Sequence, residues 1–379
     1  MRNDFLDYYG EHNISPVRQD ISDLEVHYER REKLYKQCGI PIITFRNAEI
    51  LEVGPGGGYN TLAFFHWNSK HVDLVEANAA GRRDINRLFS SHDIAKDKYD
   101  IFPCKIEDYE TDKKYDIIIA ESFLPYIFNQ YEVMDKLKEL VTEHGIIVIT
   151  CAEHAGFFVE TVKRLVGKTI TVNIPEYDKK VEYLTDFFAP QLAKLRGVSR
   201  KAEDWVKDQI LNPAIANEME LTMLQAIEYF EEGFDVLGCS PQMFTDYSWY
   251  KDIWYDYKQD YKEQFNKKRL SLLLANMPEL ILPVEQADVV VKCCEKIRMY
   301  AAEYETKFDI KMIDYILDEM KSMKDILQQY LAPDFLDVYY EINNILLSIQ
   351  KREDIDIENY PHFFSAFGRT QQYISFVKK

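Results

Sequence analysis

The chain has 379 residues, of which 46 are basic and 64 acidic, giving a formal net charge of −18. So acidic a surface repels phosphate backbones, and the basic patch that we considered, Arg82-Arg83, is too short to offset this repulsion. We therefore expect no nucleic-acid partner. Hydrophobic residues make up 46 % and aromatic residues 14 %, which excludes a disordered chain and indicates a sizeable core.

The cysteines and the apolar runs bear on the compartment. The six cysteines contain no CxxC pair and no spacing typical of a disulfide framework. The first residues lack the apolar stretch of a signal peptide, and no apolar run approaches the roughly 20 residues that cross a bilayer. We therefore expect reduced cysteines, a cytoplasmic location, no membrane insertion and no metal site.

The first half of the chain alternates between short apolar runs and amphipathic stretches. Residues 1–39 form a polar lead-in with a charged helix, expected from about Asp20 to Gln37. The region 40–167 then carries strand candidates at 48–53, 72–75, 99–102, 115–120 and 145–151, with helices expected at 131–141 and 157–166. Strands that alternate with helices predict a doubly wound α/β core, with a parallel sheet covered on both faces.

The second half is mostly helical in pattern. Residues 168–230 show no strand ladder and are interpreted as a helical insertion between the fifth and sixth strands. The region 231–258 holds a strand candidate at 234–239 and most of an aromatic stretch from Phe244 to Tyr261. Region 259–379 is predicted to be a helical C-terminal appendage, with helices at 310–327 and 335–349. Its helices are candidates for homo-oligomer contacts.

The most specific motif lies where the first expected strand ends. The run Glu52-Val53-Gly54-Pro55-Gly56-Gly57-Gly58-Tyr59-Asn60 leads from an apolar strand through an acidic residue into a glycine-rich turn. Glycines let the backbone approach a ligand closely. A dinucleotide fingerprint needs a small residue at position 59, where this chain has tyrosine. The spacing is therefore Glu-x-Gly-x-Gly-x-Gly.

This run resembles the first motif of class I methyltransferases, whose Rossmann-like core binds S-adenosylmethionine. In that family the loop cradles the amino-acid end of the cofactor. The resemblance, which covers roughly 45–165 and 228–250, implies cofactor-binding roles for Glu52, Gly54, Gly56, Gly58 and Asn60. The alternative is an ordinary tight turn between a strand and a helix.

Glu76 supports the cofactor interpretation by its position. It ends the apolar run Val72–Val75 and lies 22 residues after Gly54. Rossmann-like folds place an acidic side chain about 20 residues after the loop, where it accepts both ribose hydroxyls. We therefore predict this role for Glu76, against the alternative of a surface glutamate.

Two further segments resemble the family less closely. The run Lys105-Ile106-Glu107-Asp108 occupies the place where methyltransferases carry an acid that binds adenine, and Lys105 departs from the common pattern. The local sequence is similar to that of protein arginine methyltransferases. This resemblance implies that Ile106 and Glu107 contact the cofactor, with Asp108 as the second candidate for the acidic residue. The alternative is a solvated acidic turn.

Glu121, directly after the strand candidate at 115–120, also resembles an arginine methyltransferase residue. Those enzymes hold guanidinium with a second glutamate nine residues later, where this chain has Gln130. They also continue into a β-barrel, whereas this chain continues into helices. We therefore do not predict arginine as the substrate.

The catalytic residues predicted for methyl transfer are Glu121 and His154. Positioning alone supplies roughly 7–11 kcal/mol of such a barrier, and a general base adds about 10²–10⁴-fold when the acceptor is a hydroxyl. Histidine has a suitable unperturbed pKa for that task. Other side chains that we considered for the acceptor pocket are Arg196, Arg200, Trp205, Asn212 and the aromatic residues Tyr247, Trp249, Tyr250, Trp254, Tyr255 and Tyr257.

The function predicted is S-adenosylmethionine-dependent methylation of a small-molecule or glycan-linked acceptor, at oxygen rather than nitrogen. Segments 13–20 and 234–241 are similar to little-characterised bacterial methyltransferases associated with surface-glycan assembly. The enzymatic alternatives are an aminopropyltransferase or an NAD-type oxidoreductase. The alternative of another class is a non-catalytic scaffold that retained the fold.

Overall fold

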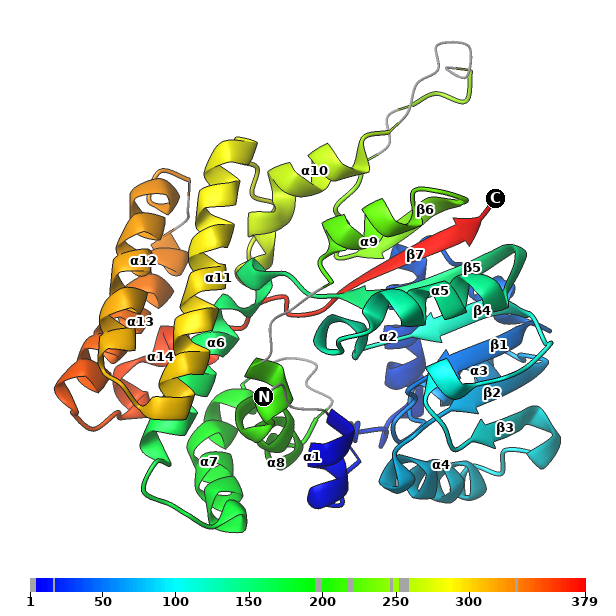
Figure 1. Cartoon of the computed structure of the whole chain (residues 1–379), viewed down its shortest axis with the longest axis horizontal. Coiled ribbons are helices and arrows are strands. Elements are labelled where there is room, and N and C mark those ends of the chain that lie inside the picture. Colours follow the sequence, from blue (N-terminus) through cyan, green and yellow to red (C-terminus); the bar gives the residue numbers. More distant parts are fainter. Residues whose placement is uncertain are drawn as a thin grey trace. The chain divides into compact units, whose positions relative to one another are not determined.

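The computed structural model describes residues 5–15, 18–194, 200–216, 221–245, 248–251, 259–330 and 333–379. The chain divides into two compact units (Figure 1). The sheet unit comprises Met1–Cys151, Met219–Gln264 and Gln371–Lys379, and the helical unit comprises Ala152–Glu218 and Phe265–Thr370.

The sheet unit is built on seven strands in the order β3-β2-β1-β4-β5-β7-β6. Their bounds are β1 (Glu49–Val53), β2 (His71–Val75), β3 (Tyr99–Phe102), β4 (Tyr115–Ala120), β5 (Val141–Cys151), β6 (Phe234–Ser240) and β7 (Gln372–Lys378). The first five strands are parallel, and β7 runs antiparallel to both β5 and β6. The strand order reverses between β1 and β4, where open α/β sheets bind ligands at the carboxyl ends of their strands.

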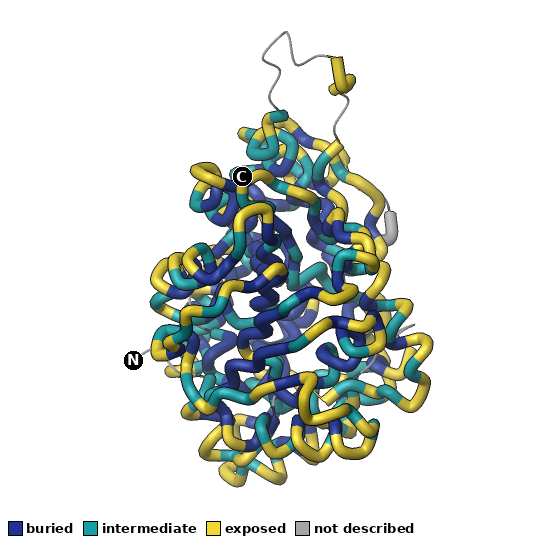
Figure 2. The backbone as a smooth tube through the Cα atoms, turned by 90° about the vertical axis from the view of Figure 1, so that its right-hand side faces the viewer, coloured by how far each residue is buried: buried dark blue, intermediate teal, exposed yellow. Residues whose placement is uncertain are grey.

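Helices cover both faces of this sheet, and β1, β2 and β4 are buried along most of their length (Figure 2). Successive residues of β7 show the two faces, because side chains alternate along a strand. Ser375 donates to the carbonyl of Cys38, just after α2 (Leu24–Gln37), at 2.5 Å. The next residue, Phe376, stacks on Phe230 of α9 (Met223–Phe230) with ring centroids 4.3 Å apart.

The face that meets α2 also carries α3 (Thr61–His66) and α4 (Ala79–Ser91). Their buried side chains form one core with alternate strand residues, including Tyr35, Phe64, Phe89, Ile117 and Ile119. On the α9 face lies α5 (Gln130–Leu140), whose Lys138 ammonium sits over the Phe230 ring. The prediction of a doubly wound, Rossmann-like α/β core is therefore confirmed.

Boundaries in the first half agree closely with the sequence. The strands at 99–102 and 115–120 have the predicted bounds, whereas β5 begins four residues earlier than expected, at Val141. The charged helix begins at Leu24 rather than Asp20, because the Asp23 side chain accepts the N–H of Val26 and caps it. A helix that we did not predict, α1 (Phe5–Glu11), lies in the polar lead-in.

The prediction of an all-helical region 259–379 is wrong at its end. Residues Gln372–Lys378 form β7, which pairs with β5 and β6. Because β7 is buried on both faces, its sequence lacks the clear alternation of polar and apolar residues that marks a half-exposed strand. Its short apolar run therefore cannot be distinguished from a buried segment of helix by periodicity alone. The helices before it are consequently an insertion between β6 and β7, not an appendage.

The helical unit has one shared hydrophobic core. Its longer helices are α6 (His154–Ile170), α7 (Tyr177–Leu192), α11 (Val284–Lys307), α12 (Lys311–Leu327) and α13 (Pro333–Lys351), followed by the short α14 (Pro361–Ser365). Side chains from both chain segments meet in that core, among them Leu165, Leu184, Phe188, Ile297, Ile316 and Ile342. The predicted insertion 168–230 is therefore not a separate domain, since most of it packs with 265–370 and α9 belongs to the sheet unit. None of the described helices combines the length and apolarity that crossing a membrane requires.

Candidate functional site

The glycine loop follows β1 and leads into α3. Gly54, Gly56 and Gly58 have φ angles of +67°, +58° and +77°, in the left-handed region that side chains with a Cβ rarely adopt. Gly81, in the first turn of α4, brings that helix close, because a Cβ there would lie 2.7 Å from the Gly56 carbonyl oxygen. The loop thus needs its glycines to fold as it does, and their contact with a cofactor stays a prediction.

Glu76 follows β2 and reaches the glycine loop. Its two carboxylate oxygens accept the main-chain N–H groups of Gly56 at 2.8 Å and Asn78 at 2.7 Å. The side chain is 5 % exposed, and this burial raises the pKa of Glu76 to about 7 against the opposing effect of the two N–H donors. A carboxylate offers about four lone-pair sites, so two acceptor positions are left for a ligand.

Glu52, near the end of β1, ties the strand to α3. Its Oε2 accepts the Thr61 hydroxyl at 2.6 Å, and burial raises the pKa of Glu52 to about 8. The group is therefore largely protonated at neutral pH. Asn60, just before α3, accepts the side-chain amide of Gln19 at 3.0 Å and faces Glu121 Oε2 at 3.4 Å.

Ile106 and Glu107 lie in the short 3₁₀ turn η3 (Ile106–Asp108), after β3. Ile106 is buried, Glu107 is half-buried and Asp108 is exposed. The Glu107 carboxylate accepts the side-chain amide of Asn129, which precedes α5. Because β3 neighbours β2, this turn lies at the same sheet edge as Glu76.

Glu121, directly after β4, has partners that the sequence analysis did not identify. The Arg31 guanidinium of α2 donates through Nη2 to Glu121 Oε1 at 2.6 Å, and the Tyr35 hydroxyl donates to the same oxygen at 3.0 Å. The Arg31 and Glu121 side chains are 8 % and 9 % exposed. Arg31 and Tyr35 thus both occupy the same carboxylate oxygen of Glu121. The role of Glu121 as a base stays a prediction.

His154 belongs to the helical unit, where it is the first residue of α6. Its Nδ1 is buried without a hydrogen-bond partner. Burial, with a smaller contribution from the charge of Arg298, lowers the pKa of His154 to about 4. The imidazole is therefore neutral but weakly basic, and its catalytic role also stays a prediction.

The other residues considered for an acceptor pocket are mostly engaged inside their own unit. Arg200 pairs with Asp208 at 2.9 Å, and the Asn212 carbonyl accepts from the Arg164 guanidinium at 2.7 Å. Trp205 packs edge-on against Phe188. Trp249 and Tyr250 are exposed. The candidates that lie outside the described residues are Arg196, Tyr247, Trp254, Tyr255 and Tyr257.

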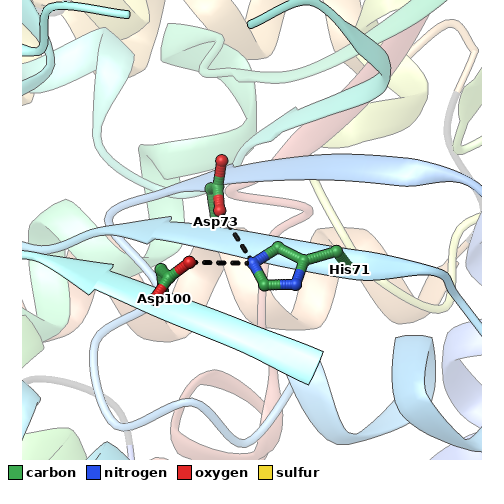
Figure 3. A group of neighbouring side chains, drawn as sticks. All are labelled: His71, Asp73 and Asp100. Carbon is green, nitrogen blue, oxygen red and sulfur yellow. Dashed lines mark ion pairs between the residues drawn. The ribbon is translucent and has the colours of Figure 1, made fainter. Parts of the chain in front are cut away.

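His71, Asp73 and Asp100 form a group whose geometry could hold a metal ion (Figure 3). His71 Nε2 lies 3.1 Å from Asp73 and 3.2 Å from Asp100. The second oxygen of Asp73 already accepts from Tyr115 at 2.6 Å and Lys113 at 3.0 Å. His71 and Asp100 lie at the starts of β2 and β3, and Asp73 lies in the middle of β2, so the group is away from the strand ends that carry Glu76 and the loop. We interpret them as an ion-pair cluster that joins the two strands.

The comparison with known proteins gives a relative for part of the chain. No family model matches. Over 143 residues the chain is 27 % identical to the ubiquinone biosynthesis O-methyltransferase of Rickettsia bellii, a match that covers 37 % of this chain and 51 % of the relative. The chain thus spans about half the length of the curated relatives it matches.

Solved structures give more distant likenesses. The N-methyltransferase NodS from Bradyrhizobium japonicum, in complex with S-adenosylhomocysteine, is 16 % identical with a TM-score of 0.32, over 39 % of this chain and 74 % of that one. PKMT2 from Rickettsia typhi, in complex with the same compound, is 17 % identical with a TM-score of 0.41, over 63 % and 49 %. By its curated sequence match and its doubly wound sheet, this chain is similar to the class I, S-adenosylmethionine-dependent methyltransferases.

Proposed function

We propose that this chain is an S-adenosylmethionine-dependent methyltransferase with its cofactor site at the carboxyl ends of β1 and β2. The observation that carries the proposal is the hydrogen bond from Gly56 to the buried Glu76 carboxylate, at 2.8 Å. It sets an acidic acceptor beside a left-handed glycine loop at the point where the strand order reverses. Glu76 keeps acceptor positions for two ribose hydroxyls, so the residues present fit the cofactor.

Each predicted residue has a definite task in this proposal. When bound, the cofactor supplies an electrophilic methyl group on a sulfonium. Gly54, Gly56 and Gly58 let the main chain approach its amino-acid end, and Asn60 offers a side-chain amide there. Ile106 and Glu107 contact the adenine, since their turn follows the strand next to β2. Glu52 fixes the two ends of the loop relative to each other, because its hydrogen bond with Thr61 joins β1 to the start of α3.

We further propose oxygen of a small-molecule or glycan-linked acceptor as the methylated atom. The curated relative from Rickettsia bellii is named an O-methyltransferase, and the net charge of −18 disfavours nucleic acid. A hydroxyl acceptor needs a proton acceptor nearby, for which Glu121 and His154 remain the candidates.

Titration calorimetry of the purified protein tests the cofactor first. We expect S-adenosylmethionine and S-adenosylhomocysteine to bind, and NAD not to bind, because Tyr59 occupies the position that a dinucleotide loop keeps small. Binding of NAD without binding of S-adenosylhomocysteine would overturn the proposal in favour of an oxidoreductase. A co-purified ligand identified by mass spectrometry provides an independent check.

A further inference from the structure

One face of α2 carries three buried polar side chains at helical spacing. His27, Arg31 and Tyr35 lie four residues apart, so they project from the same side of the helix. His27 Nε2 lies 3.0 Å from the Tyr59 carbonyl oxygen of the glycine loop. Arg31 and Tyr35 both reach Glu121, which faces Asn60 at the end of that loop. The polar face of α2 therefore lies beside the glycine loop.

The Arg31 guanidinium on this face is charged and incompletely paired. Burial by itself lowers the pKa of Arg31. The neighbouring Glu121 carboxylate contributes to a larger opposite effect, so the net pKa is raised and the guanidinium keeps its proton. Nη2 donates to both Glu121 and Tyr35. Nε, in contrast, is buried with no hydrogen-bond partner. An unsatisfied buried donor is costly, and a ligand that brings an acceptor removes that cost.

The acidic side chains around the loop repel a negatively charged ligand less than their number suggests. Burial raises the pKa of Glu52 to about 8 and that of Glu76 to about 7, so both are partly or largely neutral near pH 7. Glu121 is compensated by Arg31. A second carboxylate next to the guanidinium therefore meets little repulsion.

Two other arginines near the loop are engaged elsewhere. Arg82 donates through Nη1 to the carbonyls of Glu76 and Ala77. Arg18 pairs with Asp84 at 3.6 Å. Of these three guanidinium groups, Arg31 is the one that combines burial beside the loop with an unpaired donor.

We propose that Arg31 binds the carboxylate at the methionine end of the cofactor, and that Glu121 and Tyr35 position its guanidinium. The inference rests on the proposed function, because it needs that cofactor. It gives Glu121 a positioning role, which explains why its carboxylate is buried against an arginine instead of being open to an acceptor. A hydroxyl acceptor would then lose its proton to another group or directly to water.

The test compares two ligands that differ in the amino-acid part. S-adenosylhomocysteine carries the carboxylate, whereas 5′-methylthioadenosine has the same nucleoside and lacks it. Calorimetry is done on the wild type, on Arg31→Met combined with Glu121→Gln, and on Glu121→Gln alone. The double variant avoids a buried unpaired charge, which would destabilise the fold. Arg30→Met, one residue away on the same helix, is the matched control.

In the double variant we expect S-adenosylhomocysteine to bind about 10–150-fold more weakly, the range for losing a charged hydrogen-bond partner. Binding of 5′-methylthioadenosine should stay within about twofold of the wild type. Glu121→Gln alone should lose a smaller part of the S-adenosylhomocysteine affinity, and Arg30→Met should lose none.

Two results would overturn the inference while leaving the proposed function intact. One is equal weakening of both ligands in the double variant, which would indicate a purely structural role for the pair. The other is unchanged affinity for S-adenosylhomocysteine. A wild-type protein that binds neither ligand would instead overturn the proposed function, and this inference with it.

Discussion

The Glu76 carboxylate accepts the main-chain N–H of Gly56 at 2.8 Å, so one side chain after β2 fixes the loop that follows β1. The same carboxylate accepts the N–H of Asn78, whose own side chain caps α4 by accepting from Ala80 at 3.0 Å. The two strand ends and the start of α4 are therefore held by one buried acid. Any change at Glu76 acts on the loop and on the proposed ribose contact together.

The first prediction concerns that acid. Glu76→Ala should weaken S-adenosylhomocysteine binding by about 10–150-fold, because the buried carboxyl group that accepts from the ribose hydroxyls is lost. Calorimetry measures the affinity, and Glu110→Ala, which removes an exposed acid of the same unit, is the control. A folded Glu76→Ala protein with wild-type affinity would contradict the ribose assignment.

The second prediction concerns the left-handed loop. Gly56→Val should abolish cofactor binding and also cost roughly 1–3 kcal/mol of stability, because a β-branched residue is strained at a φ of +58°. Gly233→Val is the control. It introduces a similar backbone strain at a φ of +81°, in a turn where an added Cβ would contact no atom within 4 Å. If both variants melt alike but only Gly56→Val fails to bind, the loop contacts the ligand. Equal binding by both would leave Gly56 a purely structural glycine.

The third prediction concerns the protonation of Glu52. Its pKa in the folded protein is about 8, above the ordinary value of 4.5, so the folded state holds an extra proton between these limits. The stability associated with this proton is complete below about pH 4.5 and is lost as the pH rises through about 8. Glu52→Gln does not titrate, and its amide oxygen still accepts from Thr61.

The melting temperature of Glu52→Gln should therefore rise relative to the wild type by several degrees between pH 5 and pH 8.5. Thermal unfolding followed by circular dichroism gives the difference at each pH. Glu49→Gln on the same strand is the control. Lys70 and Lys113 outweigh burial there and lower the pKa of Glu49, so its titration lies below this pH window. A constant difference for Glu52→Gln would show that the residue is ionised throughout.

The fourth prediction concerns the helical unit. Phe188 of α7 is buried in the core that this helix shares with α6 and α14, and Phe188→Ala should cost about 3–5 kcal/mol of that unit's stability. Tyr183→Ala, at an exposed position of the same helix, should cost little. Hydrogen exchange should show loss of protection in the helical unit with S-adenosylhomocysteine affinity unchanged. Loss of protection in β1, β2 and β4 as well would mean that the two units unfold as one.

The sequence was sufficient for features whose signal is local. The glycine loop and Glu76 lie within 25 residues of each other, and strand ends place them at the same edge by general rules of parallel sheets. The Arg31–Glu121 pair could not be predicted in this way, since 90 residues separate its members. Glu121 was identified from its place directly after a strand, but Arg31 is one charge among several in its helix, and nothing local indicates that the two pair.

The prediction for the second half of the chain was incomplete for a related reason. The amphipathic stripes correctly predicted helices at 310–327 and 335–349, which are α12 and α13 to within a few residues. They did not show that α7 shares a hydrophobic core with these helices, because the period of a stripe identifies a buried face and not the partner that covers it. Strand β7 was missed because its pairing with β5 and β6 is non-local.

The position of β7 also bears on how the nascent polypeptide reaches its native state. β6 ends at Ser240 and β7 begins at Gln372, so 131 residues (372 − 240 − 1) leave the ribosome between two neighbouring strands. During that interval β6 lacks the strand that joins it to β5, and both present open hydrogen-bonding edges of the kind that promote aggregation. The strands that carry the cofactor loop, Glu76 and Glu121 are all synthesised earlier. The strands β1 to β4, which carry the proposed ligand-binding residues, can therefore assemble during translation before β7, the strand between β5 and β6, has been synthesised.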